Sequence, residues 1–138
     1  MTDTTPTESN LSGLDRKDFQ KNINSRKTDL YILKNAQGME VAVTNYGCAI
    51  LSIMVPDKNG KFANVILGHD SIEHVINSPE PFLSTTIGRY GNRIANGKFT
   101  LYGEEHQLTV NNGPNSLHGG PTGFHARVWD AVQPNEST

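Results

Sequence analysis

The sequence has little of several features that mark whole classes of protein. Cys48 is the single cysteine among 138 residues, so neither an intrachain disulfide nor a thiolate metal cluster can form. The formal net charge of −2 gives no reason to expect nucleic acid or an anionic membrane as a partner. Residues 1–10 are polar and rich in threonine, without the apolar run of a secretory signal or a membrane span. These features predict a cytoplasmic protein.

The length of 138 residues suits one domain with a core of its own. We expect residues 1–24 to be a flexible polar leader, in which residues 14–19 could form one short helical turn. Residues 25–138 are expected to form the folded part. No internal repeat and no low-complexity tract is present outside the leader.

From Asp29 onward the pattern is typical of β structure. Residues 39–44 alternate apolar and polar side chains with a period of two, and residues 49–55 are nearly all apolar, which is typical of a strand buried on both faces. The predicted strands are 30–33, 39–44, 49–55, 63–67 and 128–132, and residues 98–110 read as a hairpin. The fold class is therefore all-β, and periodicity alone does not distinguish a sandwich from a barrel.

Few residues depart from this β pattern. Residues 71–77 are expected to form a short helix with Ser71 as its N-cap, and Pro79 should end it. Cys48 should be a small buried hydrophobe, because it lies in the apolar stretch 48–51, and no catalytic thiol is expected, because nothing nearby would lower its pKa. Trp129 should pack, with its indole nitrogen bonded to one partner.

Some side chains on the predicted hairpin and its surroundings can be assigned to the core or to the surface. Phe99 and Leu101 share one strand face and should be core, whereas Glu104 and Glu105 are adjacent, face opposite ways and should lie on the surface.

The other histidines do not suggest a metal site. Histidines 69 and 74 lie five residues apart with no third ligand near, so no metal site is expected. His106 and His125 are expected to be structural or exposed.

Two Gly-punctuated loops concentrate polar side chains and could form a binding site. The first, Gly88–Ile94, contains Asn92 and Arg93, and the second, Asn111–Gly120, contains His118. Amide, guanidinium and imidazole groups together suit a ligand covered in hydroxyls, because each hydroxyl both donates and accepts hydrogen bonds. The same residue types are also common in solvated loops of any all-β protein, so this interpretation stays open on the residues alone.

Several separated motifs carry a resemblance to a known family. The runs VTNYGCAILSIMVPDKNGKFANVILGHDS, GNRIANGKFTLYG, NNGPNSLHGG and GFHARVWDA follow one another in order over about a hundred residues. From Thr28 to Val132 the chain resembles the N-terminal part of the aldose 1-epimerases, also called galactose mutarotases. The resemblance implies a galactose mutarotase-like antiparallel β-sandwich, of which this chain would supply a part that is incomplete at its C-terminus.

The resemblance also implies an activity and a set of roles. Such isomerases interconvert the α and β anomers of free aldoses such as galactose or glucose by acid/base-catalysed ring opening and closure, without a cofactor. By motif, Asn92, Arg93 and His118 would bind the sugar. The family's catalytic histidine and glutamate would lie beyond Thr138, so no catalytic residue is expected within this chain, which on its own should be inactive.

Two other classes of function fit the same residues. A chain that keeps the three binding residues could be a non-catalytic carbohydrate-binding module or an inactive remnant. A structural fragment could instead self-associate through unpaired strand edges. The sequence identifies neither the preferred sugar nor the oligomeric state.

Overall fold

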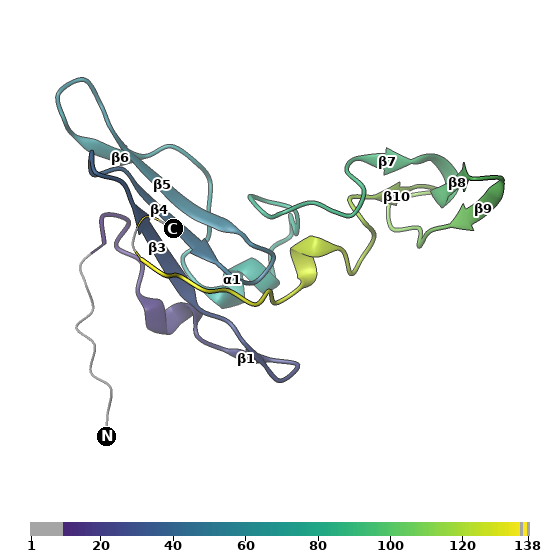
Figure 1. Cartoon of the computed structure of the whole chain (residues 1–138), viewed down its shortest axis with the longest axis horizontal. Helices are drawn as coiled ribbons and strands as arrows, with labels where there is room; N and C mark the ends of the chain where they lie inside the picture. Colours follow the sequence, from purple (N-terminus) through teal and green to yellow (C-terminus); the bar gives the residue numbers. More distant parts are fainter. Residues whose placement is uncertain (1–9, 136, 138) are drawn as a thin grey trace.

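The structure is a computed structural model, and it describes residues 10–135 and 137. Its largest element is an antiparallel sheet whose strands lie side by side in the order of the sequence. These strands are β3 (Leu30–Lys34), β4 (Glu40–Thr44), β5 (Ile50–Pro56) and β6 (Phe62–Asn64). An arm made of shorter strands projects from one end of this sheet (Figure 1). The prediction of an all-β fold is confirmed.

The fourth strand of the sheet is shorter than predicted. β6 ends at Asn64, and Val65 and Leu67, predicted as strand residues, are 59% and 74% exposed. The Asn64 side chain causes this, because its Oδ1 accepts hydrogen bonds from the backbone N–H groups of Ile53 (3.0 Å) and Ile66 (3.3 Å). A side chain thus occupies a ladder position and turns the chain out of the sheet.

The buried face of the sheet carries small and polar side chains on its central strand. Glu40, Ala42 and Thr44 of β4 are each fully buried. The pairing of β4 with β5 shifts register after Ala42, which leaves Leu51 as an extra, buried residue in a bulge. The core consists of Phe19, Leu30, Ala42, Ala49, Leu51, Ile72 and Val75. Residues 53–55 of β5 are half-buried and both ends of the strand are exposed, so the prediction that this strand is buried on both faces was wrong.

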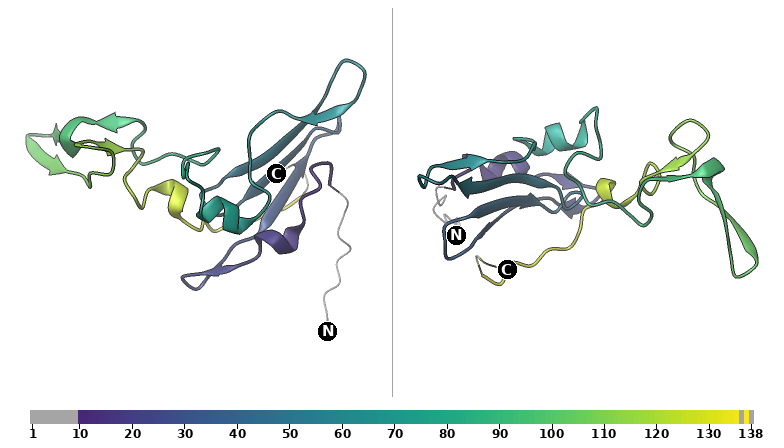
Figure 2. Two further views of the ribbon diagram at one scale, coloured as in Figure 1. Left: turned by 180° about the vertical axis from the view of Figure 1, so that it is seen from behind. Right: turned by 90° about the horizontal axis from the view of Figure 1, so that it is seen from above.

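Two short helices cover the core face, and the C-terminal segment runs along the other face (Figure 2). The helices are η1 (Arg16–Phe19) and α1 (Ile72–Ile76). The predicted cap of α1 is confirmed, because the Ser71 hydroxyl accepts a hydrogen bond from the His74 N–H. Among the described residues no helix is long and apolar enough to cross a membrane.

Part of the expected leader belongs to the folded body. Residues 1–9 lie outside the described residues, but Phe19 is fully buried and Leu14 packs against the core. The Thr28 hydroxyl donates to the Phe19 carbonyl at 2.7 Å, and a hairpin of β1 (Asn22–Ile23) and β2 (Arg26–Lys27) follows. For residues 14–23 the expectation of a flexible leader was wrong, because one large aromatic side chain anchors them.

The predicted strand at residues 128–132 is replaced by an irregular segment. Val128 forms one isolated bridge with Tyr46. Beyond it, the buried Asn45 provides the hydrogen bonds of a strand: its backbone carbonyl accepts from the Trp129 N–H (2.8 Å) and its side-chain amide donates to the Trp129 carbonyl (2.9 Å). The same amide group donates to the Lys27 carbonyl, so one asparagine joins three segments.

The arm contains the predicted hairpin. Its strands are β7 (Arg93–Ile94), β8 (Lys98–Leu101), β9 (Glu104–Gln107) and β10 (Ser116–Leu117), with η2 (Ala95–Gly97) between β7 and β8. Glu104 and Glu105 are exposed, as predicted. Phe99 and Leu101 were expected in the core, but Leu101 is 48% exposed and Phe99 is half-buried against the His106 ring. The reason is that the arm extends away from the sheet.

The two outer strands of the four-stranded sheet are β3 and β6. Gln133 covers part of the edge of β3, because its amide group donates to the Ile32 carbonyl at 2.6 Å.

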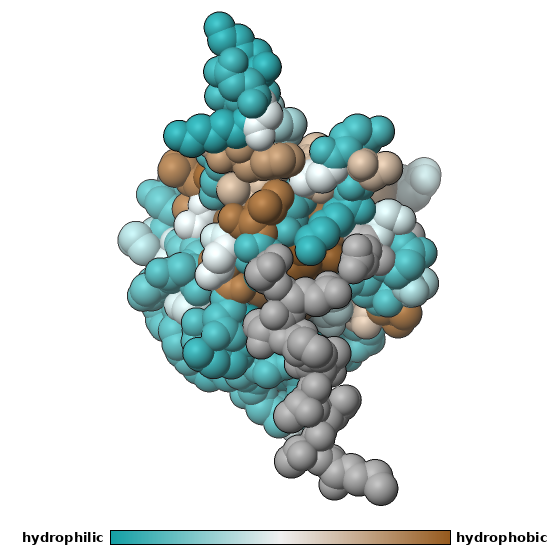
Figure 3. All heavy atoms as spheres, turned by 90° about the vertical axis from the view of Figure 1, so that its left-hand side faces the viewer, coloured by the Kyte–Doolittle hydropathy of each residue, from teal (hydrophilic) through white to brown (hydrophobic). Residues whose placement is uncertain are grey.

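Figure 3 shows the end of the molecule that carries the β3–β4 and β5–β6 turns, where apolar side chains gather between hydrophilic ones. Apolar area therefore reaches the surface at this end of the sheet.

Candidate functional site

The short ladder between β7 and β10 brings the three predicted site residues together. Arg93 pairs with Leu117 at the end of this ladder, and Asn92 and His118 lie one residue beyond that pair. The His118 N–H donates to the Asn92 carbonyl at 3.0 Å, as in a regular strand pair. The Asn92 N–H, however, donates to Nδ1 of the His118 ring, also at 3.0 Å. The imidazole nitrogen thus accepts the hydrogen bond that a backbone carbonyl would accept in a regular strand pair.

This hydrogen bond fixes which nitrogen of His118 carries the proton. A nitrogen that accepts from a backbone N–H must have a free lone pair, so Nδ1 carries no hydrogen. In the neutral ring the proton is therefore on Nε2, which becomes a donor. Both residues have positive φ, 55° for Asn92 and 52° for His118, a conformation that few residues other than glycine adopt. The chain bends at this pair and presents the Nε2–H of His118 as a hydrogen-bond donor.

The guanidinium of Arg93 is held beside this pair by asparagines. Its Nε donates to Oδ1 of Asn112 at 2.9 Å, and one terminal nitrogen approaches Oδ1 of Asn92 at 3.4 Å. The neighbouring Asn111 fixes the strand that precedes His118, since its side chain bonds both the N–H and the carbonyl of Leu117. Sequence reasoning missed Asn111 and Asn112, for which the Asn-Asn-Gly run was the available signal.

Glycines let the two loops approach each other closely. Gly119 has φ of +85°, and a Cβ placed on it would lie 1.9 Å from the Gly88 carbonyl oxygen. The same oxygen accepts a hydrogen bond from the Phe124 N–H at 3.1 Å, at the start of η3 (Phe124–Ala126). The loop that holds Asn92 is thus connected to the segment after His118 through Gly88.

An aromatic row lies behind His118. The ring of Phe82 lies 4.8 Å from the His118 ring and 4.6 Å from the His125 ring, measured between centroids. His125 is only 6% exposed, and its Nδ1 is buried without a hydrogen-bond partner among the residues that the structure describes. Burial lowers the pKa of His125, and the nearby charge of His118 lowers it further. Of the two expectations for His125, structural or exposed, its burial excludes the exposed one.

The depressed pKa of His125 should make the fold sensitive to acid. Because the unfolded chain binds the proton more tightly than the folded one, stability is present above the ordinary pKa of 6.5 and is lost as the pH falls towards the folded value. We expect the urea midpoint to fall as the pH drops below 6.5. In His125→Phe the urea midpoint should fall less with pH. The control is His106→Phe, at a half-buried histidine of the hairpin, which should show the same fall as the wild type. Equal pH dependence in His125→Phe and the wild type would contradict this prediction.

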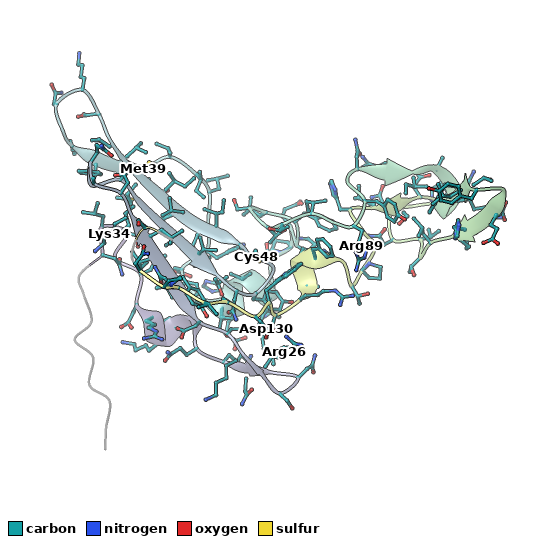
Figure 4. All side chains as sticks on the ribbon, viewed as in Figure 1. Arg26, Lys34, Met39, Cys48, Arg89 and Asp130 are labelled. Atoms are coloured by element: carbon teal, nitrogen blue, oxygen red, sulfur yellow. The ribbon has the colours of Figure 1, made fainter. Side chains whose placement is uncertain are left out.

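A large cleft lies beside these residues, but the predicted site residues do not line it. Its volume is about 830 Å³, and its walls include Arg26, Arg89, Trp129 and Asp130. Arg89 lies 5.6 Å from the centre of the Phe124 ring, and the labelled side chains in Figure 4 show Arg89 on the arm side and Arg26 close to Asp130. The prediction that the Trp129 indole nitrogen bonds one partner is confirmed, because it donates to the Phe124 carbonyl at 3.2 Å.

The remaining candidate groups offer little chemistry. No group of three potential metal ligands exists among residues 10–135 and 137. The side chain of His74 instead contacts Asp70, with Nδ1 and Oδ1 2.5 Å apart. Cys48 is half-buried rather than buried, and burial raises the pKa of its thiol more than a hydrogen bond with Thr86 lowers it. A thiol held in this way is a poor nucleophile.

The antiparallel sheet and the strands of the arm make this an all-β protein, and comparison with solved structures shows that its fold is of the galactose mutarotase-like type. A solved structure of an aldose epimerase homologue from C. elegans is similar to this chain, with a TM-score of 0.73 and 33% identity, and the match covers 79% of this chain and 33% of that one. A galactose 1-epimerase from Lactobacillus acidophilus is similar with a TM-score of 0.67 and 31% identity, and the match covers 83% of this chain and 33% of that one. The sequence profile of the aldose 1-epimerase family matches residues 29–138. The chain belongs to that family.

Curated relatives agree with this assignment. The galactose mutarotase of Bos taurus is 43% identical over 91 residues, which cover 66% of this chain and 26% of the relative. The aldose 1-epimerase of Escherichia coli (strain K12) is 40% identical over 107 residues, which cover 78% of this chain and 31% of the relative. The chain therefore spans between a quarter and a third of the length of these relatives.

Proposed function

We propose that this chain provides the sugar-holding loops of an aldose 1-epimerase that interconverts the anomers of a free aldose such as galactose or glucose. One observation carries the proposal: within residues 10–135 and 137, Nε2–H of His118 has no hydrogen-bond partner, while Asn92 joins the His118 ring to the guanidinium of Arg93. Donors in a fixed arrangement suit the several oxygens of a pyranose. Relatives named galactose mutarotase and aldose 1-epimerase support the choice of ligand.

The reaction sets what each group must do. A base takes the proton from the anomeric hydroxyl while an acid protonates the ring oxygen, so that the C1–O5 bond breaks and an open-chain aldehyde forms. Rotation about C1–C2 and closure in the opposite sense give the other anomer. Asn92 and Arg93 hold hydroxyls, and His118 donates near the reacting end of the sugar. These are positioning roles, and they need no cofactor.

The acid and the base are proposed to lie outside residues 1–138. The carboxylates that follow Arg93 most closely in the sequence are Glu104 and Glu105, which lie exposed on the far hairpin, where Glu105 pairs with Lys98 at 2.8 Å. His118 already uses Nδ1 to accept from Asn92. A cytoplasmic location and self-association through β3 and β6 stay predictions within the same proposal.

A binding experiment tests the sugar-holding role separately from turnover. We expect the chain to bind D-galactose or D-glucose weakly, measured by saturation-transfer NMR titration. Arg93→Lys should weaken binding about five- to tenfold, because an ammonium cannot reproduce the guanidinium fork, a change of about 1–1.4 kcal/mol. Arg26→Lys, at an exposed ion pair with Asp130, is the matched control and should leave affinity unchanged.

Polarimetry on freshly dissolved α-D-galactose tests turnover. A rate equal to the buffer blank is expected when the acid and base are outside the chain, because binding groups alone recover little of the rate. A rate above the blank would overturn that location of the acid and base. Absence of sugar binding by the folded wild-type chain would overturn the sugar-holding role.

A further inference from the structure

Phe82 reaches the site from a part of the sequence that the site motifs do not include. It lies in a turn in which the Thr85 N–H approaches the Phe82 carbonyl at 3.4 Å. The next residues are fixed to the large sheet, because the Ile50 N–H of β5 donates to the Ser84 carbonyl at 2.9 Å. The Ser84 hydroxyl also donates to the Leu67 carbonyl. The position of the Phe82 ring is thus tied to the sheet rather than to the arm.

The Phe82 ring connects two imidazoles that come from different loops. It is tilted by 59° to His118 and meets His125 edge to face at 61°. Such tilted and edge-to-face arrangements are the favourable ones for aromatic pairs. His125 is itself fixed, because a Cβ on Gly47 would come within 2.3 Å of the His125 carbonyl oxygen and the Gly47 N–H donates to the Arg127 carbonyl at 2.7 Å. The far end of the row is therefore rigid.

We propose that Phe82 is a positioning residue for His118, and that its ring, supported by the buried His125, holds the His118 imidazole with Nε2–H directed at the sugar. The inference rests on the proposed function for the identity of the ligand, but not for the ring contacts. The Asn92 N–H fixes one nitrogen of His118. A single hydrogen bond leaves the ring free to tilt about that contact, and the Phe82 face removes this freedom.

The energetic scale of this support is modest and measurable. Aromatic pairs of this geometry contribute about 0.5–1.5 kcal/mol beyond the area they bury. If that contribution keeps His118 oriented, its loss corresponds to roughly a two- to tenfold weaker hold on a ligand that His118 binds. Phe82 makes no contact with the sugar in this account, so it acts through His118 alone.

The test uses the full chain labelled with ¹⁵N in its histidine rings. In the wild type without sugar, His118 should show an unprotonated Nδ1 and a protonated Nε2. In Phe82→Leu these two resonances should move towards each other, as the ring samples both tautomers, and the galactose dissociation constant should rise about two- to tenfold. Phe82→Tyr, which keeps an aromatic face, should retain the wild-type ring signals and stay within about twofold in affinity.

Phe99→Leu is the matched control, because Phe99 also stacks on a histidine, His106, at 5.0 Å, but on the hairpin. It should shift the His106 signals and leave those of His118 and the sugar affinity unchanged. Unchanged His118 ring signals in a folded Phe82→Leu chain would overturn the inference, as would equal losses in Phe82→Tyr and Phe82→Leu. A wild-type chain that fails to bind sugar counts against the proposed function, and the ring signals without sugar still decide the role of Phe82.

Discussion

Gly119→Ala is expected to destabilise the folded chain by about 2–5 kcal/mol and to separate the two site loops. A non-glycine residue at a strongly positive φ costs roughly 1–2 kcal/mol. At Gly119 the new methyl group would also lie 1.9 Å from the Gly88 carbonyl oxygen, a backbone atom that cannot rotate away. The loops must therefore part, which adds a further 1–3 kcal/mol of strain. Urea unfolding measures the loss.

Gly103→Ala separates the two causes. Gly103 has the same φ of +85°, but a Cβ on it would meet no atom of the described part of the chain within 4 Å. It should therefore lose only the conformational part, roughly 1–2 kcal/mol. Because the Phe124 N–H bonds the Gly88 carbonyl, Gly119→Ala should also accelerate hydrogen exchange at Phe124, whereas Gly103→Ala should not. Equal destabilisation by the two substitutions would contradict the close approach of the loops.

The sheet could be predicted from the sequence because its signals are local. The alternation in residues 39–44 and the Pro-Asp-Lys-Asn-Gly turn place β4, β5 and the connection to β6 within a residue or two. Two of the failed predictions, the length of β6 and the strand at residues 128–132, share one physical cause. Asn64 and Asn45 use their side chains to satisfy backbone partners of other segments, which shortens β6 and replaces a strand near Trp129. Propensity does not record such distant partners.

The site could be predicted in part for a related reason. Asn92, Arg93 and His118 stand in recognisable loop motifs, and the structure brings them together at the end of the β7–β10 ladder. The use of Nδ1 as a substitute for a backbone carbonyl depends on the positive φ values of two residues, and their types allow those values without requiring them. Phe82 lies 36 positions before His118 and carries no motif, so only the folded chain shows their contact.

The N-terminal segment shows how one buried charge can oppose a compositional signal. The polarity of residues 1–24 favours disorder, yet the carboxylate of Glu40 accepts the Leu11 N–H at Oε2 (2.9 Å) and the Ser12 N–H at Oε1 (3.1 Å). Glu40 is fully buried on β4, and Lys34 on the neighbouring strand lies 3.9 Å away. Where apolar and polar residues alternate along a strand, a glutamate is expected to face solvent, so the inward direction of Glu40 could not be predicted.

Glu40→Ala is expected to cost about 3–5 kcal/mol, because removal of a buried carboxylate leaves Lys34 and two backbone donors without their partner. Glu40→Gln preserves the volume, but its amide nitrogen would face an N–H donor, so part of the loss should persist. Exposed Glu80→Gln is the control and should change the urea midpoint little. Hydrogen exchange at Leu11 and Ser12 should accelerate in both Glu40 variants. Exchange as slow as in the wild type would show that the carboxylate does not anchor this segment, and would return residues 11–12 to the expected leader.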